Sequence, residues 1–343
     1  MPAPILDQPE PRLVVLMPTW FGDCLMAIPT LRAIKHHRPD AHLAVQLREP
    51  LAPLVEGLPF VDERIPVPVD GPGASPLAAA GQLRGRSFGA AVLLPNSFRA
   101  AAVAALALIP RRIGYARDGR SGLLTDRLIP QRSGRRFTPV PTLEYYLSLA
   151  YYLGAPRRDD DHRMEIVTRP EDDQRATELL ASAKGRPVVL LNPGAQKPAK
   201  RWPADRFARL AARCSQELGC AVAVTGSPAE RDILARVTGA ATTPIIDLPK
   251  AGMNLRLLKS VTRAAALMVT NDTGPRHLAA AAGTPVVTLF GPTTPDWTHI
   301  GFEHERQVIA ADAGQPDSMA NIGVDEVFAR CLELLPPSPP ASA

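Results

Sequence analysis

The stretch LVVLMPTWFGDCLMAIPTLRAIK, residues 13–35, runs from an apolar segment through a turn into a helical pattern. The apolar residues 13–17 predict a buried strand, and residues 23–37 predict a helix that ends before Pro39. Gly22 permits a tight turn between the two. A strand, a turn and a helix in this order start a parallel α/β sheet, and the helix N-terminus is suited to an anion or a sugar.

The same alternation continues along the chain and then starts again. In the first half we expect strands at 42–47 and 90–95 and a helix at 98–108. The second half predicts strands at 188–192, 220–226, 244–249, 266–271 and 284–291, with helices at 203–218, 228–238, 254–263 and 275–282. The strands are apolar throughout, as in parallel sheets that helices cover on both faces. The sequence therefore predicts an α/β protein of two Rossmann-like, doubly wound domains that face each other across a cleft.

The boundary between the domains is expected between the aromatic helix at 144–154 and the strand at 188. We predict an N-terminal domain at 12–168, a C-terminal domain at 169–323 and a C-terminal helix at 324–335 that packs back on a domain face. The tails at 1–11 and 336–343 are expected to be disordered.

Composition excludes several classes of protein. Of the 343 residues, 45% are hydrophobic and 21% are charged, which is typical of a globular protein and excludes disorder as the main state. No apolar run of membrane-spanning length occurs, and the N-terminus lacks the pattern of a signal peptide, so we expect a cytoplasmic protein. The four cysteines form no CxxC pair, and we expect reduced thiols rather than a zinc site or a disulfide framework.

Arginines gather in residues 97–140, which hold nine arginines and two aspartates, a net charge of +7. Such a window favours an anionic partner, namely nucleic acid, phospholipid or a phosphorylated sugar, and the alternative is a solvated basic loop. No nucleic-acid-binding motif or aromatic platform accompanies it, so nucleic acid is not expected as a partner.

Asp23 lies where the first strand ends and the following helix begins. It is either a general base at the carboxyl edge of the sheet or an acid that the helix dipole favours. Neither GxGxxG nor GxxxxGK[ST] follows the strand, which excludes the NAD fingerprint and the P-loop of kinases.

A second motif, NPGAQKPAKRWPADRF, follows the first strand of the second half at 192–207. Gly194 and its neighbours interrupt the strand and leave backbone N–H groups available to a ligand. Lys197, Lys200 and Arg201 add positive charge. This combination is suited to a diphosphate, and the alternative is a basic surface loop. Trp202 is expected to pack rather than to stack on a ligand.

The third motif is VTNDTGPRHLAAAAGTPVVTLFGPT, residues 269–293. Asp272 or Thr273 is expected to cap a helix that ends at Gly283. The N-terminus of this helix is suited to a phosphate or a sugar hydroxyl, with His277 in its first turn. The alternative is an ordinary capped helix in which His277 is a satisfied polar residue.

In order and spacing, these motifs resemble the ADP-heptose:lipopolysaccharide heptosyltransferases, glycosyltransferase family 9. The resemblance covers about residues 12–335 and is carried by MPTWFGDCLMAIPTLRAI, GLLTDRL, NPGA…AKRWP and NDTGPRHLAAAAGTPVVTLFGPT. AKRWP and GLLTDRL look more like the second heptosyltransferase than the first. The resemblance implies a GT-B fold, with an acceptor-binding N-terminal domain and a C-terminal domain that binds the nucleotide sugar. It also implies transfer with inversion, without a metal ion or cofactor, from ADP-L-glycero-D-manno-heptose to a heptosyl-Kdo2-lipid A type acceptor in the inner core of lipopolysaccharide.

Carried over by position, Asp23 matches the catalytic base of the family and Lys200 the lysine at the donor diphosphate. The DTGxxH element that contacts the heptose and phosphates corresponds to Asp272, Thr273, Gly274 and His277. Met253 falls where the family contacts adenine, and Glu230 is expected at the ribose hydroxyls. The donor site also includes Gly194 and Lys197, and the anionic, lipid-linked acceptor is expected at Gly22, Arg99, Arg117 and Arg120.

Two other functions stay open at this level. One is a GT-B enzyme that uses another nucleotide sugar or epimerises one. The other is a nucleotide-sugar-binding protein without catalysis, against which the presence of both Asp23 and Lys200 argues. A lipid acceptor would also bring the protein to the cytoplasmic face of the inner membrane, although the sequence has no evident amphipathic anchor.

Overall fold

The structure, a computed structural model, describes residues 11–134 and 136–335. Apart from Pro11, the tails expected to be disordered lie outside the described residues. The chain divides into two compact units. The N-terminal unit extends to Val167 and includes Asp296–Ile300, and the C-terminal unit holds the rest from Thr168 onward.

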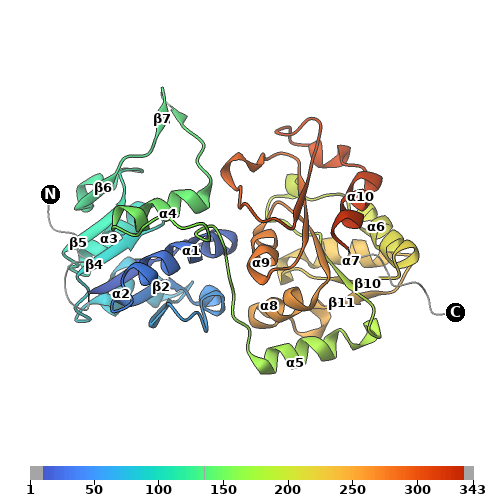
Figure 1. The fold of residues 1–343 in the computed structure, drawn as a ribbon, viewed down its shortest axis with the longest axis horizontal. Coiled ribbons are helices and arrows are strands. Elements are labelled where there is room, and N and C mark those ends of the chain that lie inside the picture. Colours follow the sequence, from blue (N-terminus) through green and yellow to red (C-terminus); the bar gives the residue numbers. More distant parts are fainter. Residues whose placement is uncertain (1–10, 135, 336–343) are drawn as a thin grey trace. The chain divides into compact units, whose positions relative to one another are not determined.

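The N-terminal unit is built on a six-stranded sheet in the order β3-β2-β1-β4-β5-β6, with every neighbouring pair parallel. Figure 1 shows this sheet with its helices. The strands are β1 (Arg12–Leu16), β2 (His42–Arg48), β3 (Glu63–Val67), β4 (Ala90–Leu93), β5 (Arg111–Tyr115) and β6 (Asp126–Leu128). The helices are α1 (Phe21–His37), α2 (Pro76–Leu83), α3 (Phe98–Leu106) and α4 (Thr142–Tyr152), and a small hairpin comprises β7 (Arg132–Ser133) and β8 (Arg136–Phe137).

The C-terminal unit repeats this plan with the order β11-β10-β9-β12-β13-β14, again all parallel. Its strands are β9 (Val188–Asn192), β10 (Ala221–Val224), β11 (Ile245–Asp247), β12 (Leu267–Asn271), β13 (Val286–Phe290) and β14 (Glu305–Ile309). Its helices are α5 (Pro170–Leu179), α6 (Ala204–Glu217), α7 (Arg231–Ala240), α8 (Leu255–Ala264), α9 (Gly274–Ala282) and α10 (Val324–Leu334).

Alternate residues of the strands in the C-terminal unit pack into two hydrophobic cores, one on each face of the sheet. Val189 and Leu191 belong to a cluster with residues of α6, α7 and α10, whereas Val188 and Leu190 belong to a cluster with residues of α5, α8 and α9. Helices therefore cover both faces, which explains why these strands are apolar throughout. The predicted doubly wound α/β architecture is confirmed in each unit.

The strand order reverses at one place in each sheet, between β1 and β4 and between β9 and β12. In an open parallel sheet, ligands bind beyond the carboxyl ends of the strands at such a switch point. Asp23 follows β1, the loop with Gly194 and Lys200 follows β9, and Asp272 follows β12. The three motifs therefore lie at the switch points.

Sequence patterns missed several elements, because these are short or carry charge. β3 has the sequence ERIPV and lies at the edge of its sheet, β6 has only three residues, and β14 begins with Glu305-Arg306. All four cysteines are free thiols and are buried. No helix among the described residues is long and apolar enough to cross a membrane.

Candidate functional site

In the C-terminal unit, the side chain of Asn271 joins the loop after β9 to the end of β12. Its Nδ2 donates hydrogen bonds to the carbonyl oxygens of Pro193 (3.0 Å) and Gly194 (3.1 Å), and its Oδ1 accepts one from the backbone N–H of Trp202 (3.1 Å). Asn271 is fully buried. It therefore fixes both ends of the loop that carries Lys200.

The substitution Asn271→Asp is expected to lower the free energy of unfolding by about 2–3 kcal/mol. It replaces a buried donor group by a carboxylate oxygen that faces two carbonyl oxygens, and unmade buried hydrogen bonds cost about 1–3 kcal/mol each. Denaturant unfolding of the purified variant measures the change. Asn254→Asp is the matched control, because Asn254 caps α8 and aspartate caps equally well. Equal stability of the two variants would contradict the role of Asn271.

Trp202 packs in the core, as the sequence favoured. It is fully buried, its ring meets that of Phe207 edge to face at 4.9 Å, and its Nε1 donates a hydrogen bond to the carbonyl oxygen of Ile322 (3.0 Å). The tryptophan therefore holds the loop against the sheet rather than offering a face to a ligand.

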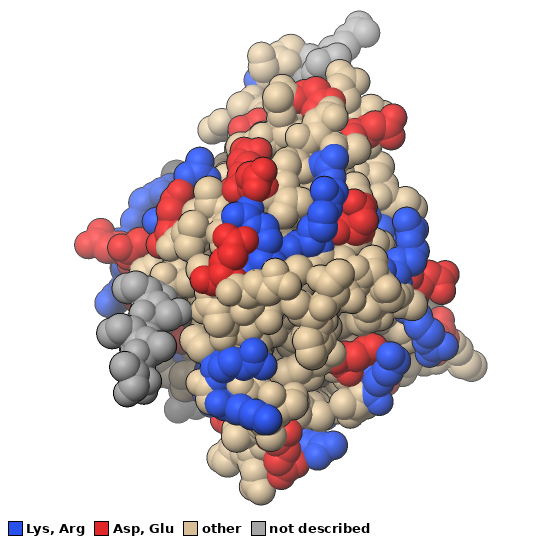
Figure 2. Space-filling view, turned by 90° about the vertical axis from the view of Figure 1, so that its right-hand side faces the viewer, with Lys and Arg blue, Asp and Glu red and all other residues tan. Residues whose placement is uncertain are grey.

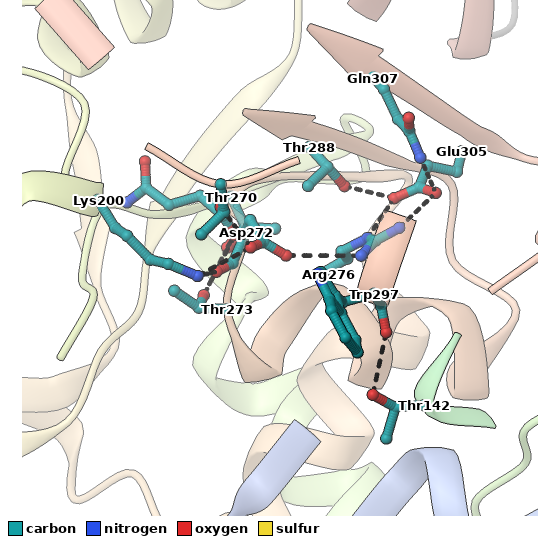
Figure 3. Close-up of polar contacts among 12 residues, drawn as sticks. Thr142, Lys200, Thr270, Asp272, Thr273, Arg276, Thr288, Trp297, Glu305 and Gln307 are labelled. Carbon is teal, nitrogen blue, oxygen red and sulfur yellow. Dashed lines mark hydrogen bonds and ion pairs between the residues drawn. The ribbon is translucent and has the colours of Figure 1, made fainter. Parts of the chain in front are cut away.

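Lys200 and Asp272 form an ion pair, shown in Figure 3. The Lys200 Nζ donates to Oδ2 of Asp272 (2.8 Å) and to its carbonyl oxygen (3.1 Å), and Oδ2 also accepts a hydrogen bond from Thr293 (2.8 Å). Burial alone would raise the pKa of Asp272, but Lys200 and Arg276 outweigh it and hold that pKa below its usual value. The carboxylate is therefore ionised, and it holds the lysine ammonium at the start of α9.

Among the described residues, no side chain makes a capping hydrogen bond at the N-terminus of α9, so the capping expected from Asp272 or Thr273 is wrong. Thr273 occupies the cap position, but its hydroxyl donates to the carbonyl oxygen of Asn271 (3.2 Å), and the Asp272 carboxylate is engaged by Lys200. The helix ends at Gly283 in a left-handed conformation (φ 74°), as the sequence predicted. The first N–H groups of α9 are therefore left without the side-chain partner that most helices have.

His277 lies in the first turn of α9 and is buried. Its Nδ1 has no hydrogen-bond partner among the described residues, so the interpretation of His277 as a satisfied polar residue is wrong for this atom. Burial, followed by the charge of Arg276, lowers the pKa of His277 to about 3. The imidazole is therefore neutral at physiological pH, and its Nδ1 can form a hydrogen bond with a ligand at the N-terminus of α9.

Gly194 and Glu230 lie against each other. The Glu230 carboxylate accepts hydrogen bonds from the backbone N–H and the hydroxyl of Ser227 (both 2.8 Å) in a capping box. A Cβ atom at residue 194 would lie only 2.1 Å from Oε1 of Glu230, so a larger residue there would require the Glu230 side chain to move. Of the other expected donor residues, Met253 is half-buried against the core, Lys197 is exposed, and Gly274 begins α9.

In the N-terminal unit, Asp23 lines a cavity of about 490 Å³ at the carboxyl end of β1. The carboxylate lies in the first turn of α1 but makes no cap, and it has no hydrogen bond or ion pair within the described part of the chain. Burial raises its pKa to about 6. Asp23 is therefore a half-buried carboxylate with the proton affinity of a general base near neutral pH.

Tyrosines and arginines form much of the remaining wall. Tyr115 and Tyr145 stack with ring centroids 3.7 Å apart, and Tyr146 and Tyr152 also line the cavity. The guanidinium of Arg117 lies 4.0 Å from the ring centroid of Phe137, another lining residue. With Arg127, these groups give the cavity stacking surfaces and positive charge.

Several arginines of the basic window are occupied within the fold. Arg120 has no exposed surface, and its guanidinium donates to the carbonyl oxygen of Tyr115 (3.0 Å) and to Asn96 Oδ1 (3.2 Å). Arg111 pairs with Asp126, and Arg112 donates to backbone carbonyl oxygens. Arg120 therefore supports the cavity wall from behind and presents no exposed surface to an acceptor in this structure.

The other two expected acceptor residues also lie outside the cavity lining, which includes neither Gly22 nor Arg99. Arg99 donates instead to the carbonyl oxygen of Ala74. Figure 2 shows a different face, on the C-terminal unit, where lysines and arginines are interspersed with acidic residues.

The chain is similar to known glycosyltransferases along most of its length. The profile of glycosyltransferase family 9 (heptosyltransferase) matches residues 77–321. The chain is 32% identical over 320 residues to lipopolysaccharide heptosyltransferase 2 of Salmonella typhimurium, covering 88% of this chain and 89% of that protein.

Two solved structures share the fold. One is the ADP-heptose LPS heptosyltransferase II of E. coli, with a TM-score of 0.78 and 27% identity over 94% of this chain and 98% of that one. The other is a family 9 glycosyltransferase of Veillonella parvula, with a TM-score of 0.83 and 22% identity over 96% and 99%. On the family match and the similarity along most of its length, the chain belongs to glycosyltransferase family 9, the heptosyltransferases.

Proposed function

We propose that this glycosyltransferase moves heptose from ADP-L-glycero-D-manno-heptose to a heptosyl-Kdo2-lipid A type acceptor of the lipopolysaccharide inner core. The observation that carries the donor half is the start of α9, where Lys200, an uncapped helix N-terminus and the unpartnered Nδ1 of His277 occur together. A diphosphate oxygen would complete the missing hydrogen bonds and meet the positive charge. Two relatives, in Salmonella typhimurium and E. coli, are lipopolysaccharide heptosyltransferases 2, which supports the sugar and the acceptor class.

In this proposal the C-terminal unit binds the donor. Lys200, with the loop around Gly194 and Lys197, faces the diphosphate. Asp272, Thr273, Gly274 and His277 contact the heptose and the phosphates. Met253 contacts the adenine and Glu230 the ribose hydroxyls.

The N-terminal unit binds the acceptor in the cavity beside Asp23. Stacked tyrosines suit the apolar faces of sugar rings, and Arg117 suits the acidic groups of the inner core. Gly22 and Arg99 would contact more distant parts of the same acceptor. Because the acceptor is a lipid, the proposal also places the enzyme at the cytoplasmic face of the inner membrane in peripheral contact.

The proposed reaction is a single displacement with inversion. The acceptor hydroxyl oxygen forms a bond to the anomeric carbon while the bond from that carbon to the diphosphate oxygen breaks on the opposite side. The hydroxyl proton goes to the Asp23 carboxylate, and ADP leaves with the bonding electrons. Lys200 and the N–H groups of α9 stabilise the charge on ADP, so no metal ion is needed at the diphosphate.

Thermal unfolding with equal concentrations of ADP, ADP-heptose, UDP and GDP tests the donor assignment. A ligand present at about 100 times its Kd stabilises the native state by about 2.7 kcal/mol, which raises the Tm by a few degrees. We expect ADP and ADP-heptose to do so and UDP and GDP to have little effect. Stabilisation by UDP or GDP instead would indicate another nucleotide sugar, and no shift with ADP would contradict the donor site.

The pH dependence of transfer follows from Asp23. The base must be ionised to accept a proton, so kcat/KM is expected to fall tenfold per pH unit below about pH 6 and to level off above it. Initial rates between pH 5 and pH 8, with stability checked at each pH, measure this profile. A flat profile across pH 6 would contradict the assignment of Asp23 as the base.

A further inference from the structure

Arg276 is an arginine with no exposed surface, placed in the first turn of α9. Its guanidinium forms a two-pronged pair with Glu305, from Nε to Oε1 at 2.6 Å and from Nη2 to Oε2 at 3.0 Å. Its Nη1 points to Oδ1 of Asp272 at 3.5 Å (Figure 3). The same guanidinium therefore links β14 to the aspartate that holds Lys200.

Glu305, the first residue of β14, is held firmly in turn. Its carboxylate accepts further hydrogen bonds from Thr288 (2.7 Å) on β13 and from Gln307 (2.9 Å). These bonds and Arg276 hold the pKa of Glu305 below its usual value although burial acts to raise it. Glu305 is thus an ionised anchor whose position is set by two strands of the sheet.

We propose that Arg276 and Glu305 are positioning residues for the donor diphosphate, because their pair orients the Asp272 carboxylate and thereby the Lys200 ammonium. Asp272 uses its two oxygens differently: Oδ1 faces Arg276, and Oδ2 accepts from Lys200 and Thr293. Because Glu305 occupies both prongs of Arg276, the guanidinium keeps only a weak, long contact with Asp272. Lys200 therefore keeps the stronger contact with this carboxylate and stays at the start of α9.

Without the Glu305 charge, the buried Arg276 guanidinium is expected to pair more closely with Asp272, which it already contacts. A two-pronged contact with Asp272 would compete with Lys200 for Oδ2, since buried cations require a paired anion. Lys200 would then lose its fixed position, and the diphosphate would lose a preorganised partner. The nucleoside part of the donor would not be affected.

This inference rests on the proposed function, and its test compares ADP with AMP. Calorimetry would measure the Kd of both nucleotides for the wild type, Glu305→Gln and the double variant Arg276→Met/Glu305→Gln. We expect both variants to bind ADP about tenfold more weakly and to bind AMP within twofold of the wild type. In Glu305→Gln the released Arg276 competes with Lys200 for Asp272, and in the double variant Asp272 loses the contact of its Oδ1 with Arg276, which orients the carboxylate. The double variant removes one cation and one anion, so the net charge of the site is unchanged, and it leaves no unpaired buried charge if Glu305→Gln alone fails to fold.

The control is Glu333→Gln, because Glu333 forms exposed pairs with Arg306 and Arg330 on another part of the same unit. It should leave both Kd values unchanged. If the variants bound ADP and AMP more weakly to the same extent, Arg276 and Glu305 would have only a structural role, and the inference would be overturned. Unchanged ADP affinity in the folded double variant would also overturn it. A wild type that binds neither nucleotide would instead overturn the proposed donor site.

Discussion

Replacing Asp23 by asparagine is expected to lower kcat for heptose transfer by about 10²–10⁴-fold, the usual contribution of a general base. Asparagine has nearly the same shape as aspartate but cannot accept the proton of the attacking hydroxyl. Initial-rate measurements with saturating donor and acceptor give kcat. The affinity for ADP should not change, because Asp23 belongs to the N-terminal unit and the proposed donor site to the C-terminal unit.

The same substitution is expected to stabilise the free protein at pH 8. Burial raises the pKa of Asp23 from 3.8 to about 6, so its contribution to stability is present below pH 3.8 and is lost as the pH rises through 6. At pH 8 the ionised carboxylate costs about 1–3 kcal/mol, since one pKa unit corresponds to about 1.4 kcal/mol. Asp23→Asn removes this cost, and its gain in Tm should disappear near pH 4.

Asp205→Asn is the matched control, because Asp205 also lies in the first turn of a helix but is exposed and pairs with a neighbouring arginine on the surface. It should change neither kcat nor the pH profile. If the Asp23→Asn enzyme transferred heptose at the wild-type rate, Asp23 would not be the catalytic base.

Replacing Lys200 by methionine is expected to weaken ADP binding by about 10- to 100-fold. Hydrogen bonds to charged groups contribute about 1.5–3 kcal/mol, and each 1.4 kcal/mol is a factor of ten in Kd. The loss has two parts: the diphosphate loses a cation, and the Asp272 carboxylate, freed from Lys200, repels the diphosphate. Calorimetric titration with ADP measures the change, and kcat should fall as well because the leaving group is less stabilised.

Lys250→Met provides the comparison. Lys250 is an exposed lysine of the same unit whose Nζ lies 2.7 Å from Oδ2 of Asp247, so its loss removes a similar ion pair at the surface. Surface pairs contribute little, and ADP affinity should stay within twofold of the wild type. Similar ADP affinity in the Lys200 and Lys250 variants would show that Lys200 does not meet the diphosphate.

The fold was largely predictable because the buried parallel strands are continuous apolar runs. The strand at 188–192 has the predicted bounds, and α9 begins one residue before the prediction. The missed strands β3 and β14 carry charged residues and lie at sheet edges, where only one neighbouring strand pairs with them. Apolar patterning is weak at such edges, and no sequence window reveals them.

The site was predictable to the extent that its residues follow strand ends. Asp23, Lys200 and Asp272 were found because each lies just beyond a strand at a switch point of its sheet. Glu305 was missed because its partner Arg276 is 29 positions away, and nothing local links the two.

Asn271 and Arg120 show the same limit. Asn271 precedes the motif aspartate, but its contacts reach back 78 residues to the loop after β9. Arg120 looked like a surface cation among other arginines, and only the tertiary structure shows its guanidinium buried against backbone carbonyl groups. Long-range pairing of polar groups is therefore the part that the sequence did not reveal.

The most direct test of the account is a transfer reaction with the purified protein, ADP-heptose and heptosyl-Kdo2-lipid A. Mass spectrometry would follow the addition of heptose to the acceptor, and NMR would give the anomeric configuration of the new bond. We expect one added heptose per acceptor, release of one ADP and an anomeric configuration opposite to that of the donor. Retention of configuration would contradict the single displacement, and failure to add heptose, while a UDP- or GDP-sugar is used, would contradict the proposed donor.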